Sequence, residues 1–474
     1  MVLPPFDPWR SGAVALDVAA TTWGSRRGVL DRQQRRLAAL LAGAAAHCPA
    51  YRERLGRSGA GARPPLHEIA PVTKAELMGR FDEWLTDPRL RREDLLRFAA
   101  DPARIGESCG EGRLLWTSSG SSGEPALFVQ DARAMAVYDA LEFLRRPRLR
   151  SSPDWWDPRG LVHRLAFVGA TGGHFAGTVS LERLRRLVPA LSNSLRGFDF
   201  LAPADTLASQ LESFAPTVLF SYPTMALLLA SRVREGDLAI RPQEIWTGGE
   251  TLTAPVRRKI EAAFGCRVGN GYGASEFLAL ATECPLGRLH LNEDWVVLEP
   301  VDEHHVPVPA GVAGHTTLLT NLANHLQPLI RYDLGDRVTL APHACPCGSP
   351  LATLEVEGRS DEVLCLLDDR QRGVPLPPLA LTTVLEDEAG VFDFQLEQTG
   401  ERALELRIAA GGEAGQAVLA TACAALGAYL ARQGLGGVRL HGVCGEPARR
   451  GDSGKLLRIL GPRGPGSDAA GERA

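Results

Sequence analysis

Residues 117–125, Thr-Ser-Ser-Gly-Ser-Ser-Gly-Glu-Pro, combine small hydroxyl side chains with two glycines. Apolar runs at 114–116 and 126–129 flank this segment, so we expect a strand, a tight loop and a second strand. Such a loop offers many backbone N–H and hydroxyl groups, and its glycines let the backbone approach a ligand closely. It is not a Walker loop, because Gly120 and Gly123 are too close and no Gly-Lys-Ser/Thr follows. The segment suits a polyphosphate; a Ser/Gly turn in a surface hairpin is the alternative.

Four thiol and imidazole side chains have the spacing of a metal site. Cys284 and His290 are six residues apart, and Cys345 and Cys347 enclose one residue and precede a glycine. Two thiols in this arrangement resemble a zinc turn, and the four side chains make a closed ligand set. We therefore predict a structural Zn²⁺, with buried free cysteines as the alternative. The other five cysteines show no ligand spacing.

Strands and helices alternate from residue 164 onward. The apolar runs predict strands at 165–168, 218–220, 245–247 and 267–268, and helices at 205–214 (with Asp205 as its cap), 223–234 and 254–264. This alternation implies a parallel sheet with right-handed crossovers. Gly-rich turns follow the strands at 169–174, 248–250 and 269–276. Because ligands of such sheets bind beyond the carboxyl ends of the strands, the turns predict a nucleotide site.

The remaining chain divides around this sheet. Ahead of it we expect a helix over 28–57, with Leu30, Leu37, Leu40 and Leu41 on its apolar side, and a helix that Thr73 caps together with Glu76. After it we expect β-structure at 316–320 and 329–332, then a strand at 363–367, a strand at 404–408, a helix at 414–433 and a strand at 438–443. The predicted fold class is α/β: a large N-terminal domain (1–357) with mostly parallel sheets and crossover helices, a small mobile α+β C-terminal domain (358–460), and a disordered tail (461–474).

The composition excludes several classes of protein. The chain has 474 residues, a hydrophobic content of 45% and a formal net charge of −4, which argues against a nucleic-acid or acidic-membrane partner. We see no signal peptide and no apolar run of about 18 residues. Nine scattered cysteines disfavour a disulfide framework. A cytoplasmic protein is the expectation.

The order of the motifs makes the chain resemble an adenylate-forming enzyme of the acyl-coenzyme A synthetase superfamily, most like its phenylacetate–coenzyme A ligase branch, over about residues 30–460. The resemblance implies that the Ser/Gly loop holds the β- and γ-phosphates of ATP, through Ser118, Ser119, Gly120, Ser121, Ser122 and Gly123. Some members of this branch also carry a structural zinc comparable to the one predicted above.

Further motifs supply the rest of the implied nucleotide site. Gly248-Gly249-Glu250 matches the turn that flanks adenine. In the motif of residues 272–276, Tyr272 would stack on adenine, Gly273 would border it, Ser275 would contact phosphate and Glu276 would help to hold Mg²⁺. Residues 331–336 match the motif whose final aspartate, Asp336, binds the ribose hydroxyls. A carboxylate that accepts two hydrogen bonds suits a vicinal diol.

The resemblance also implies a hinge and a mobile lysine. Gly358-Arg359-Ser360-Asp361 matches the hinge, with Arg359 near the nucleotide and Asp361 at the pivot, and Lys455 matches the lysine that swings over the active site. Carboxylate attack on an α-phosphate builds negative charge, so Mg²⁺ and a lysine are the groups the reaction needs. Each residue taken alone has a simpler interpretation, as a solvated loop carboxylate or an exposed lysine; their combination and order favour a nucleotide site.

The acid pocket is expected next to the nucleotide. Residues 172–175 occupy the segment that borders it in relatives, so His174 would meet the substrate carboxylate or gate the pocket; a structural histidine is the alternative. Tyr222, Trp246, Gly248 and Gly271 are predicted to line the same pocket, with core packing as the alternative for the aromatic residues.

Two positions depart from the family pattern. Glu124 stands where the loop of relatives often has a lysine, and residues 364–369, Leu-Cys-Leu-Leu-Asp-Asp, replace a basic, glycine-containing loop near the thiol entry. The prediction is therefore an ATP- and Mg²⁺-dependent ligase that activates an organic, aromatic acid and passes it to coenzyme A or a carrier-protein pantetheine. The alternatives are an adenylyltransferase that stops at the adenylate or uses a nitrogen nucleophile, and a nucleotide-binding protein without turnover.

Overall fold

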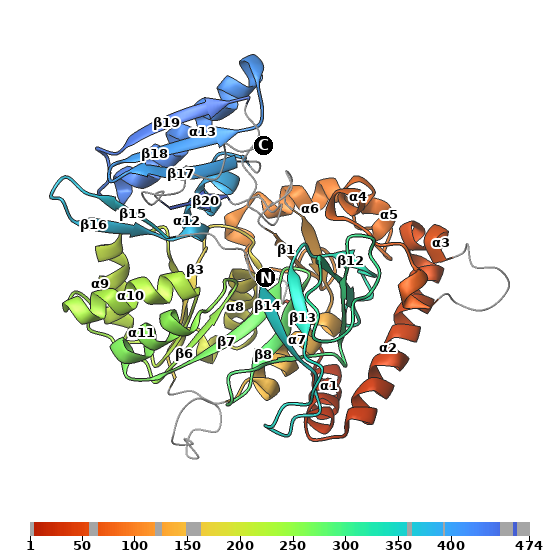
Figure 1. Cartoon of the computed structure of the whole chain (residues 1–474). Helices are drawn as coiled ribbons and strands as arrows, with labels where there is room; N and C mark the ends of the chain where they lie inside the picture. Colours follow the sequence, from red (N-terminus) through yellow and green to blue (C-terminus); the bar gives the residue numbers. More distant parts are fainter. Residues whose placement is uncertain are drawn as a thin grey trace, which may run out of the picture.

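A nine-stranded sheet forms the centre of the molecule, in the order β13-β14-β9-β8-β7-β6-β5-β3-β4 (Figure 1). The computed structural model describes residues 4–55, 65–118, 126–147, 163–357, 363–391, 394–445 and 458–461. Helices and strands mix as the α/β prediction requires, which confirms the fold class. The sheet is mixed, however, whereas a mostly parallel one was predicted.

The parallel half of the sheet follows the predicted alternation closely. Its strands are β3 (Leu165–Gly169), β4 (Leu195–Asp199), β5 (Val218–Ser221), β6 (Glu244–Gly248) and β7 (Arg267–Ala274). The crossover helices are α8 (Ala176–Leu187), α9 (Ala204–Phe214), α10 (Pro223–Glu235) and α11 (Ala254–Phe264). Thr253 caps α11 through its side chain and Gly265 ends it in a left-handed conformation, which explains why its bounds match the prediction.

The antiparallel half was not predicted. It comprises β8 (Phe277–Glu283), β9 (Leu289–Leu291), β13 (Arg337–Leu340) and β14 (Thr353–Glu357). A separate three-stranded sheet joins β10 (Val296–Val301), β11 (Thr316–Asn321) and β12 (Tyr332–Asp333), and β1 (Leu114–Thr117) pairs with β2 (Leu127–Gln130) as the flanks of the Ser/Gly loop predict.

The third Gly-rich segment is a strand where a turn was predicted. β7 continues to Ala274 and pairs with β8, so the turn is confined to residues 275–276. The glycines of β7 permit close neighbours: a Cβ on Gly269 would lie 2.6 Å from the Trp246 ring, and one on Gly273 would lie 2.1 Å from the Leu278 carbonyl oxygen. Glycine inside a strand often marks such an approach, and here it is not a turn signal.

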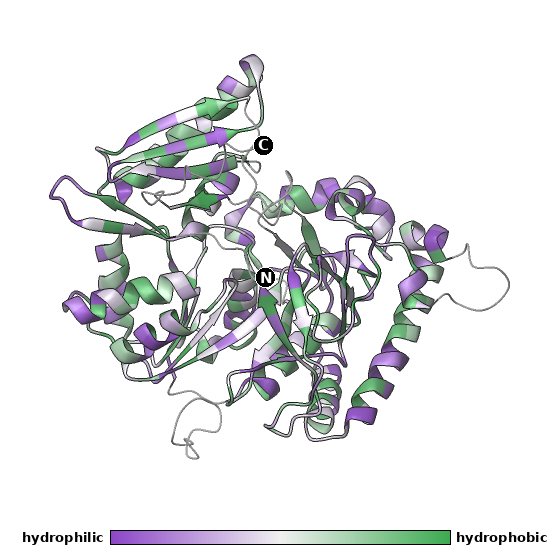
Figure 2. Ribbon diagram, in the orientation of Figure 1, coloured by the Kyte–Doolittle hydropathy of each residue, from purple (hydrophilic) through white to green (hydrophobic). Residues whose placement is uncertain are grey.

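Three of the helix predictions differ from the structure, two in the N-terminal region and one at α9. The chain forms α2 (Arg26–His47) and α3 (Pro49–Leu55) in place of one helix, because Cys48 precedes proline and is extended. Leu30 is exposed, and hydrophilic and hydrophobic bands alternate along α2 (Figure 2). Asp205 does not cap α9, whose N-cap is Pro203. Thr73 does cap α4 (Lys74–Gly79), as predicted, by accepting from the Glu76 N–H at 3.3 Å.

Two helices that the sequence did not predict lie side by side, α1 (Pro8–Thr22) and α7 (Ala132–Arg145). They run in the same direction, since Arg145 at the end of α7 donates to the Thr22 hydroxyl at the end of α1 at 3.2 Å. The remaining short helices before β1 are α5 (Phe81–Trp84) and α6 (Arg92–Ala99).

The residues after 363 build a second, four-stranded sheet in the order β19-β18-β17-β20. Its strands are β17 (Phe394–Gly400), β18 (Ala403–Ile408), β19 (Arg439–Cys444) and β20 (Ile459–Leu460), and its helices are α12 (Pro378–Thr383) and α13 (Gly412–Arg432). A hairpin of β15 (Leu364–Leu367) and β16 (Gly373–Leu376) leads into it. Residues 358–362 and 462–474 lie outside the described residues, so the domain boundary and the disordered tail stay predictions.

The small sheet lies above the side of the large sheet that carries α9, with the β15–β16 hairpin in between (Figure 1). Leu207 and Phe214 of α9 belong to the same apolar core as Leu426 and Tyr429 of α13. The Gln433 amide after α13 donates to the carbonyl oxygens of Leu201 at 3.0 Å and Ala202 at 3.2 Å. The small sheet is therefore held by both apolar and hydrogen-bonded contacts.

Helix α13 corrects the expectation that the sequence lacks a long apolar run. By length and composition alone it could cross a membrane. In the structure it buries Ala422, Leu426, Tyr429 and Leu430, and it packs against β18 and β19. A helix that covers a sheet of a folded domain meets the same criteria.

Candidate active site

The glycines at the end of β6 and within β7 lie side by side. Gly248 and Gly271 are register partners on the two parallel strands. Gly249 has a φ of +79°, and a Cβ there would lie 3.0 Å from the ring of Tyr222, which strains any other residue. The turn predicted to flank adenine is thus packed against Tyr222, at the carboxyl end of the parallel strands.

Tyr272 of β7 and Asp336, in the turn after β12, are in direct contact. The Tyr272 hydroxyl donates to Asp336 Oδ2 at 2.8 Å. Burial and the neighbouring Asp336 carboxylate raise the pKa of Tyr272, so its hydroxyl keeps its proton as a donor. One oxygen of Asp336 is fixed by this bond, and the carboxylate keeps further lone pairs for the hydroxyls of a ligand.

A tight turn aims Asp336. The Asp333 side chain accepts from the Gly335 N–H at 2.9 Å and from the Thr316 hydroxyl. Gly335 adopts a φ of +72°, where glycine carries no steric cost. The sequence motif therefore acts as a unit, in which one aspartate shapes the turn and the other is presented by it.

Arg331 anchors the same motif from inside. It is buried, has a φ of +50°, and donates to the carbonyl oxygens of His67 at 3.0 Å and Ile69 at 2.7 Å. Its left-handed backbone also explains why the strand predicted over 329–332 begins only at Tyr332. Arg331 thus joins the motif to the segment that precedes α4.

Glu276 lies in a polar cluster that the sequence only partly predicts. Burial raises the pKa of Glu276, while hydrogen bonds, including one with the Tyr332 side chain, and the charge of Lys74 act in the opposite direction. Asn321 fixes the Glu276 carbonyl oxygen through a 2.9 Å bond. Sequence reasoning missed Lys74 and Tyr332; Tyr332 sits inside a recognised motif, and Lys74 is one of only three lysines in the chain. A buried carboxylate of this kind is well suited to ionise when a cation approaches.

The base of the Ser/Gly loop is tied to both neighbouring motifs. Ser118 and Ala126 close the hairpin through an N–H to carbonyl bond of 2.9 Å. Next to it the Thr117 N–H donates to the His174 carbonyl oxygen at 2.8 Å, and the Trp116 indole donates to the Ser275 carbonyl oxygen at 2.8 Å. The loop residues Ser119, Gly120, Ser121, Ser122 and Gly123 lie outside the described residues. Their anchor points nevertheless lie beside the motif of residues 272–276.

The His174 ring packs against the segment that contains Phe98 and Asp101. It is buried, its Nε2 lies 3.0 Å from the Asp101 carbonyl oxygen, and it meets the Phe98 ring edge-on at 5.3 Å. Since a carbonyl oxygen can only accept, Nε2 of His174 carries the proton, and in the neutral ring Nδ1 is unprotonated. Burial lowers the pKa of His174, which favours the neutral form.

Stability is expected to fall as the pH drops below about 6.5. Burial lowers the pKa of His174 and brings that of His325 to about 4, so the unfolded chain binds more protons than the folded one in this window. The stabilisation is present above the unfolded pKa and is lost as the pH falls toward the folded one. Urea unfolding at pH 7.5 and 5.0 should show a smaller loss for His325→Asn than for the wild type. Exposed His304→Asn serves as the control and should keep the wild-type loss; equal losses in all three proteins would contradict the assignment.

Glu250 and Trp246 have structural partners. The Glu250 carboxylate accepts from the Thr224 N–H at 2.9 Å and from its hydroxyl at 3.0 Å, and so caps the start of α10. Trp246 is buried against Gly269, with the Arg146 guanidinium 4.8 Å from its ring centroid. Tyr222 instead packs against Phe200 at 5.7 Å. That Trp246 and Tyr222 line one acid pocket stays a prediction.

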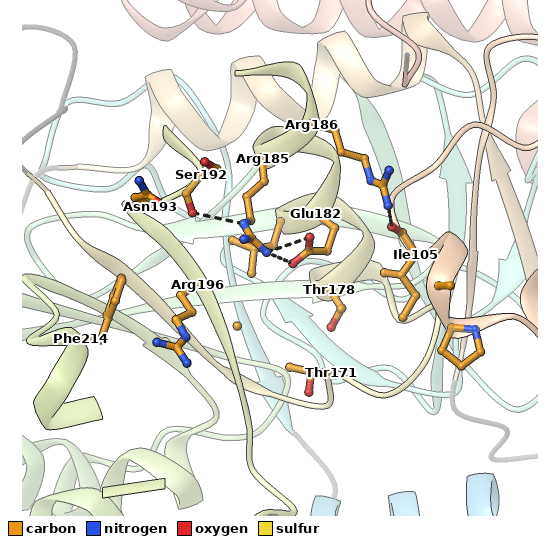
Figure 3. A pocket seen from close by; sticks show the side chains of 14 residues that line it. Ile105, Thr171, Thr178, Glu182, Arg185, Arg186, Ser192, Asn193, Arg196 and Phe214 are labelled. Carbon is orange, nitrogen blue, oxygen red and sulfur yellow. Dashed lines mark hydrogen bonds and ion pairs between the residues drawn. The ribbon is translucent and has the colours of Figure 1, made fainter. Parts of the chain in front are cut away.

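A cavity of about 560 Å³ lies at the β4 edge of the sheet, beside α8 (Figure 3). Its polar lining includes Arg185, held by both Glu182 oxygens at 2.8 and 3.0 Å, and Arg186, paired with Glu107 at 3.2 Å. Thr171, from the turn before His174, lies on its wall, but none of the residues predicted for the acid pocket does. The cavity is therefore a hollow next to the candidate site and not the predicted pocket.

The four predicted metal ligands meet in one cluster. The ligand atoms of Cys284, His290, Cys345 and Cys347 all lie within 4.8 Å of one another. Cys284 Sγ lies 4.0 Å from Cys345 Sγ, and Cys347 Sγ lies 3.3 Å from His290 Nε2. In a tetrahedral zinc site with Zn–S near 2.3 Å and Zn–N near 2.0 Å, ligand atoms are roughly 3.5–3.8 Å apart. The separations of 3.3 and 4.0 Å lie on either side of this range, and with all pairs within 4.8 Å the cluster is slightly wider than an occupied site.

The imidazole of the cluster is oriented as a ligand would be. His290 Nδ1 lies 3.1 Å from the Leu351 carbonyl oxygen, so Nδ1 carries the proton and the Nε2 lone pair faces the thiols. Gly348 follows the two cysteines with a φ of +85°, and its N–H bonds to the Cys345 carbonyl oxygen at 3.2 Å. The donor set and its support fit Zn²⁺.

Known proteins resemble part of this chain in sequence. A family model described as AMP-binding enzyme matches residues 192–315. Phenylacetate-coenzyme A ligase of Thermus thermophilus is 30% identical over 186 residues, which are 37% of this chain and 40% of that protein. Protein CapK of Staphylococcus aureus is 29% identical over 194 residues, 40% of this chain and 41% of that protein. Both matches cover about two fifths of the length of these relatives.

The fold extends the likeness to nearly the whole chain. A crystal structure of 2-hydroxyisobutyryl-CoA ligase, in complex with its acyl-adenylate and coenzyme A, matches with a TM-score of 0.53 at 20% identity, over 92% of this chain and 89% of that one. The same ligase in its postadenylation state matches with a TM-score of 0.52 over 94% and 92%.

The chain is similar to adenylate-forming enzymes in part of its sequence and in its fold. In sequence it resembles a phenylacetate–coenzyme A ligase. The predicted resemblance is thereby confirmed. Among the residues that it assigns to the reaction, Arg359, Asp361 and Lys455 lie outside the described residues, so their roles stay predictions.

Proposed function

We propose that this protein is an adenylate-forming enzyme that uses ATP and Mg²⁺ to convert an organic carboxylic acid to its acyl-adenylate and then transfers the acyl group to a thiol. In the first step a carboxylate oxygen of the acid attacks the α-phosphorus and pyrophosphate leaves. In the second step the thiol sulfur attacks the carbonyl carbon, and AMP leaves. Similarity to phenylacetate–coenzyme A ligase supports an aromatic acid and coenzyme A, with a carrier-protein pantetheine as the other acceptor.

The joint presence of Asp336 and Glu276 beside the glycine turns carries this proposal. Asp336, held by Tyr272, would accept the ribose hydroxyls. Glu276 would offer its carboxylate to Mg²⁺, which neutralises phosphate charge when bound. The Ser118 end of the phosphate loop is fixed to the same framework through Thr117 and Trp116. The groups that would bind the nucleoside, the cation and the phosphates thus lie next to one another.

A pyrophosphate-exchange screen tests this function. Purified protein is incubated with ATP, Mg²⁺, labelled pyrophosphate and a panel of aryl, arylacetic and aliphatic acids. Acid-dependent exchange is the expected result, and mass spectrometry with and without coenzyme A identifies the acceptor. Nucleotide binding without exchange for any acid would point to a binding protein without turnover.

Transfer to a nitrogen nucleophile, or release of the adenylate itself, is the second candidate. It is favoured by the segment after the hinge, where Leu364–Leu367 forms strand β15 in a hairpin with β16, in place of the basic, glycine-containing loop that the resemblance implies. We expect acid-dependent pyrophosphate release to exceed acyl-coenzyme A formation, because this segment departs from the family pattern. Parallel assays of the two products at one enzyme concentration measure the ratio. Equal rates would show that the departure is harmless.

Substitution of Asp336 should separate ribose binding from chemistry. For Asp336→Asn we expect the KM for ATP to rise roughly 10-fold or more, because a charge-assisted pair of hydrogen bonds contributes about 1.5–3 kcal/mol. Tyr272→Phe keeps the ring but removes the bond that holds Asp336, and should raise KM by less. Steady-state exchange kinetics at varied ATP measure both. A larger effect for Tyr272→Phe than for Asp336→Asn would contradict the roles given to them.

We also infer that the cluster of Cys284, His290, Cys345 and Cys347 binds one structural Zn²⁺, which would join β8 and β9 to the loop before β14. Unpaired thiols suit a reducing compartment, and all nine cysteines are free. This supports the proposal of a cytoplasmic enzyme.

A further inference from the structure

Helix α1 exposes large apolar side chains to solvent. Trp9, Leu16 and Trp23 are 88%, 75% and 82% exposed, and Phe6, just before the helix, is 53% exposed. The opposite side of the helix, with Val18 and Thr21, is buried. The helix therefore has one apolar side packed on its own chain and another that faces outward.

The outward residues repeat with the spacing of a helix seam. Phe6, Trp9, Ala13, Leu16, Ala20 and Trp23 alternate steps of three and four residues, and all six are exposed. This is the a/d pattern of a heptad repeat, which places side chains on one stripe facing a partner helix. Within the helix, large side chains occupy one of the two positions and alanines the other. A helix surface that stays in contact with water does not require such a pattern. We call these six residues the α1 seam.

The end of the neighbouring helix α7 carries a further exposed aromatic side chain. Phe143, near the end of α7, is 73% exposed, and the Arg145–Thr22 hydrogen bond keeps that end beside the end of α1. With aromatic residues burying 150–250 Å² each, the exposed parts of these side chains amount to on the order of 700 Å². Monomers rarely expose a contiguous patch above a few hundred Å². A stable interface buries about 800 Å² per partner, which this surface nearly supplies.

We propose that the α1 seam is the interface of a dimer in which a second copy of this chain packs its α1 antiparallel to the first. When residue numbers across the interface add to 29, each large side chain meets a small one: Trp9 faces Ala20, and Leu16 faces Ala13 of the second copy. The outermost layer pairs Trp23 with Phe6. A two-fold axis relates the copies, so one seam serves both sides.

Self-complementarity singles out a second copy as the occupant. Reversal of the seam exchanges its large positions with its small ones in every inner layer, which is the condition for interdigitated packing. The proposed contact does not disturb the packing of α2 on α1. Asp17, which pairs with Arg32 of α2 at 2.9 Å, lies on the flank of α1 and outside the seam. The dimer is independent of the reaction proposed above, and its test needs no substrate.

Light scattering coupled to size exclusion tests the dimer. The wild type should elute with twice the chain mass of 50.9 kDa at micromolar concentration. Leu16→Glu places a carboxylate in the central layer of both copies, and should raise the dissociation constant at least about 30-fold, the effect of a hot-spot residue. Val306→Glu, at a site 56% exposed and outside the seam, is the matched control and should stay dimeric. Unchanged melting curves would show that both variants fold.

An exchange of large and small residues tests the antiparallel register. Ala13→Leu should weaken the dimer by overpacking against the facing Leu16, and Leu16→Ala should weaken it by leaving a cavity. The double variant restores one large and one small residue in each layer and should regain most of the affinity. A monomeric wild type, or a double variant no better than its parents, would overturn the proposal. So would flotation of the wild type with phosphatidylcholine vesicles that Leu16→Glu abolishes without a change in mass, since the seam would then be a membrane contact.

Discussion

Replacement of Lys455 by alanine is expected to lower the rate of acyl-adenylate formation by roughly 10²–10³ while leaving the protein folded. Attack of the acid on the α-phosphorus builds negative charge between two anionic groups, and the resemblance gives Lys455 the task of bridging them. The chain has only two other lysines, Lys74 and Lys259, against a large number of arginines. A compact ammonium at this point is therefore hard for the chain to replace from nearby.

Single-turnover kinetics with ATP and the acid measure this effect, and Lys259→Ala is the matched control. Lys259 lies on the exposed side of α11, so its loss should leave the rate unchanged. Conversion of a supplied acyl-adenylate to the thioester should survive in Lys455→Ala, because that step places the lysine elsewhere. Equal loss of both half-reactions, in a variant with the wild-type melting curve, would refute the role.

Loss of the zinc cluster is expected to have the largest effect on stability. Cys347→Ser removes one ligand from a closed set, and the purified variant should hold far less than the one zinc per chain expected of the wild type. A loss of about 3 kcal/mol would lower Tm by roughly 3–4 °C, because an unfolding entropy of about 2.1 cal/mol/K per residue gives about 0.75–1 kcal/mol/K for a unit of this size. Elemental analysis and thermal unfolding with and without chelator provide the two readings.

Cys365→Ser is the control for the cluster, since Cys365 is exposed and lies on β15, outside it. This variant should keep both the metal and the Tm of the wild type. Wild-type protein that contains no zinc, and whose unfolding ignores the chelator, would show that the four side chains are merely neighbours.

The elements that the sequence predicted well carry their own start and stop signals. Helix α11 is bounded by the Thr253 cap and by Gly265, and strands β3, β5 and β6 are apolar on both faces because helices cover both sides. The antiparallel half was missed because its pairing depends on distant partners: β9 pairs with β14, some sixty residues on. A turn was wrongly predicted for residues 269–274, because glycine occurs both in turns and in strands where another group approaches the backbone closely.

The site shows the same division between local and distant information. The clustering of Cys284, His290, Cys345 and Cys347 could be predicted because two short spacings define a closed set. The partners of the nucleotide residues could not, since Tyr272 reaches Asp336 across 64 residues and Lys74 acts on Glu276 across about two hundred. The outward seam of α1 was also invisible, because an amphipathic pattern does not reveal which side of a helix the rest of the chain covers.

The packing of the small sheet on the large one has a consequence for how the rate would depend on temperature. Any rotation of the small sheet must break the two bonds of Gln433 and disturb the apolar core to which α13 and α9 both contribute. Separation exposes apolar surface, whose hydration carries a positive heat capacity. If that movement limits turnover, the Arrhenius plot should curve and not follow a straight line, and cooling should ease the apolar part of the separation while the hydrogen bonds still oppose it.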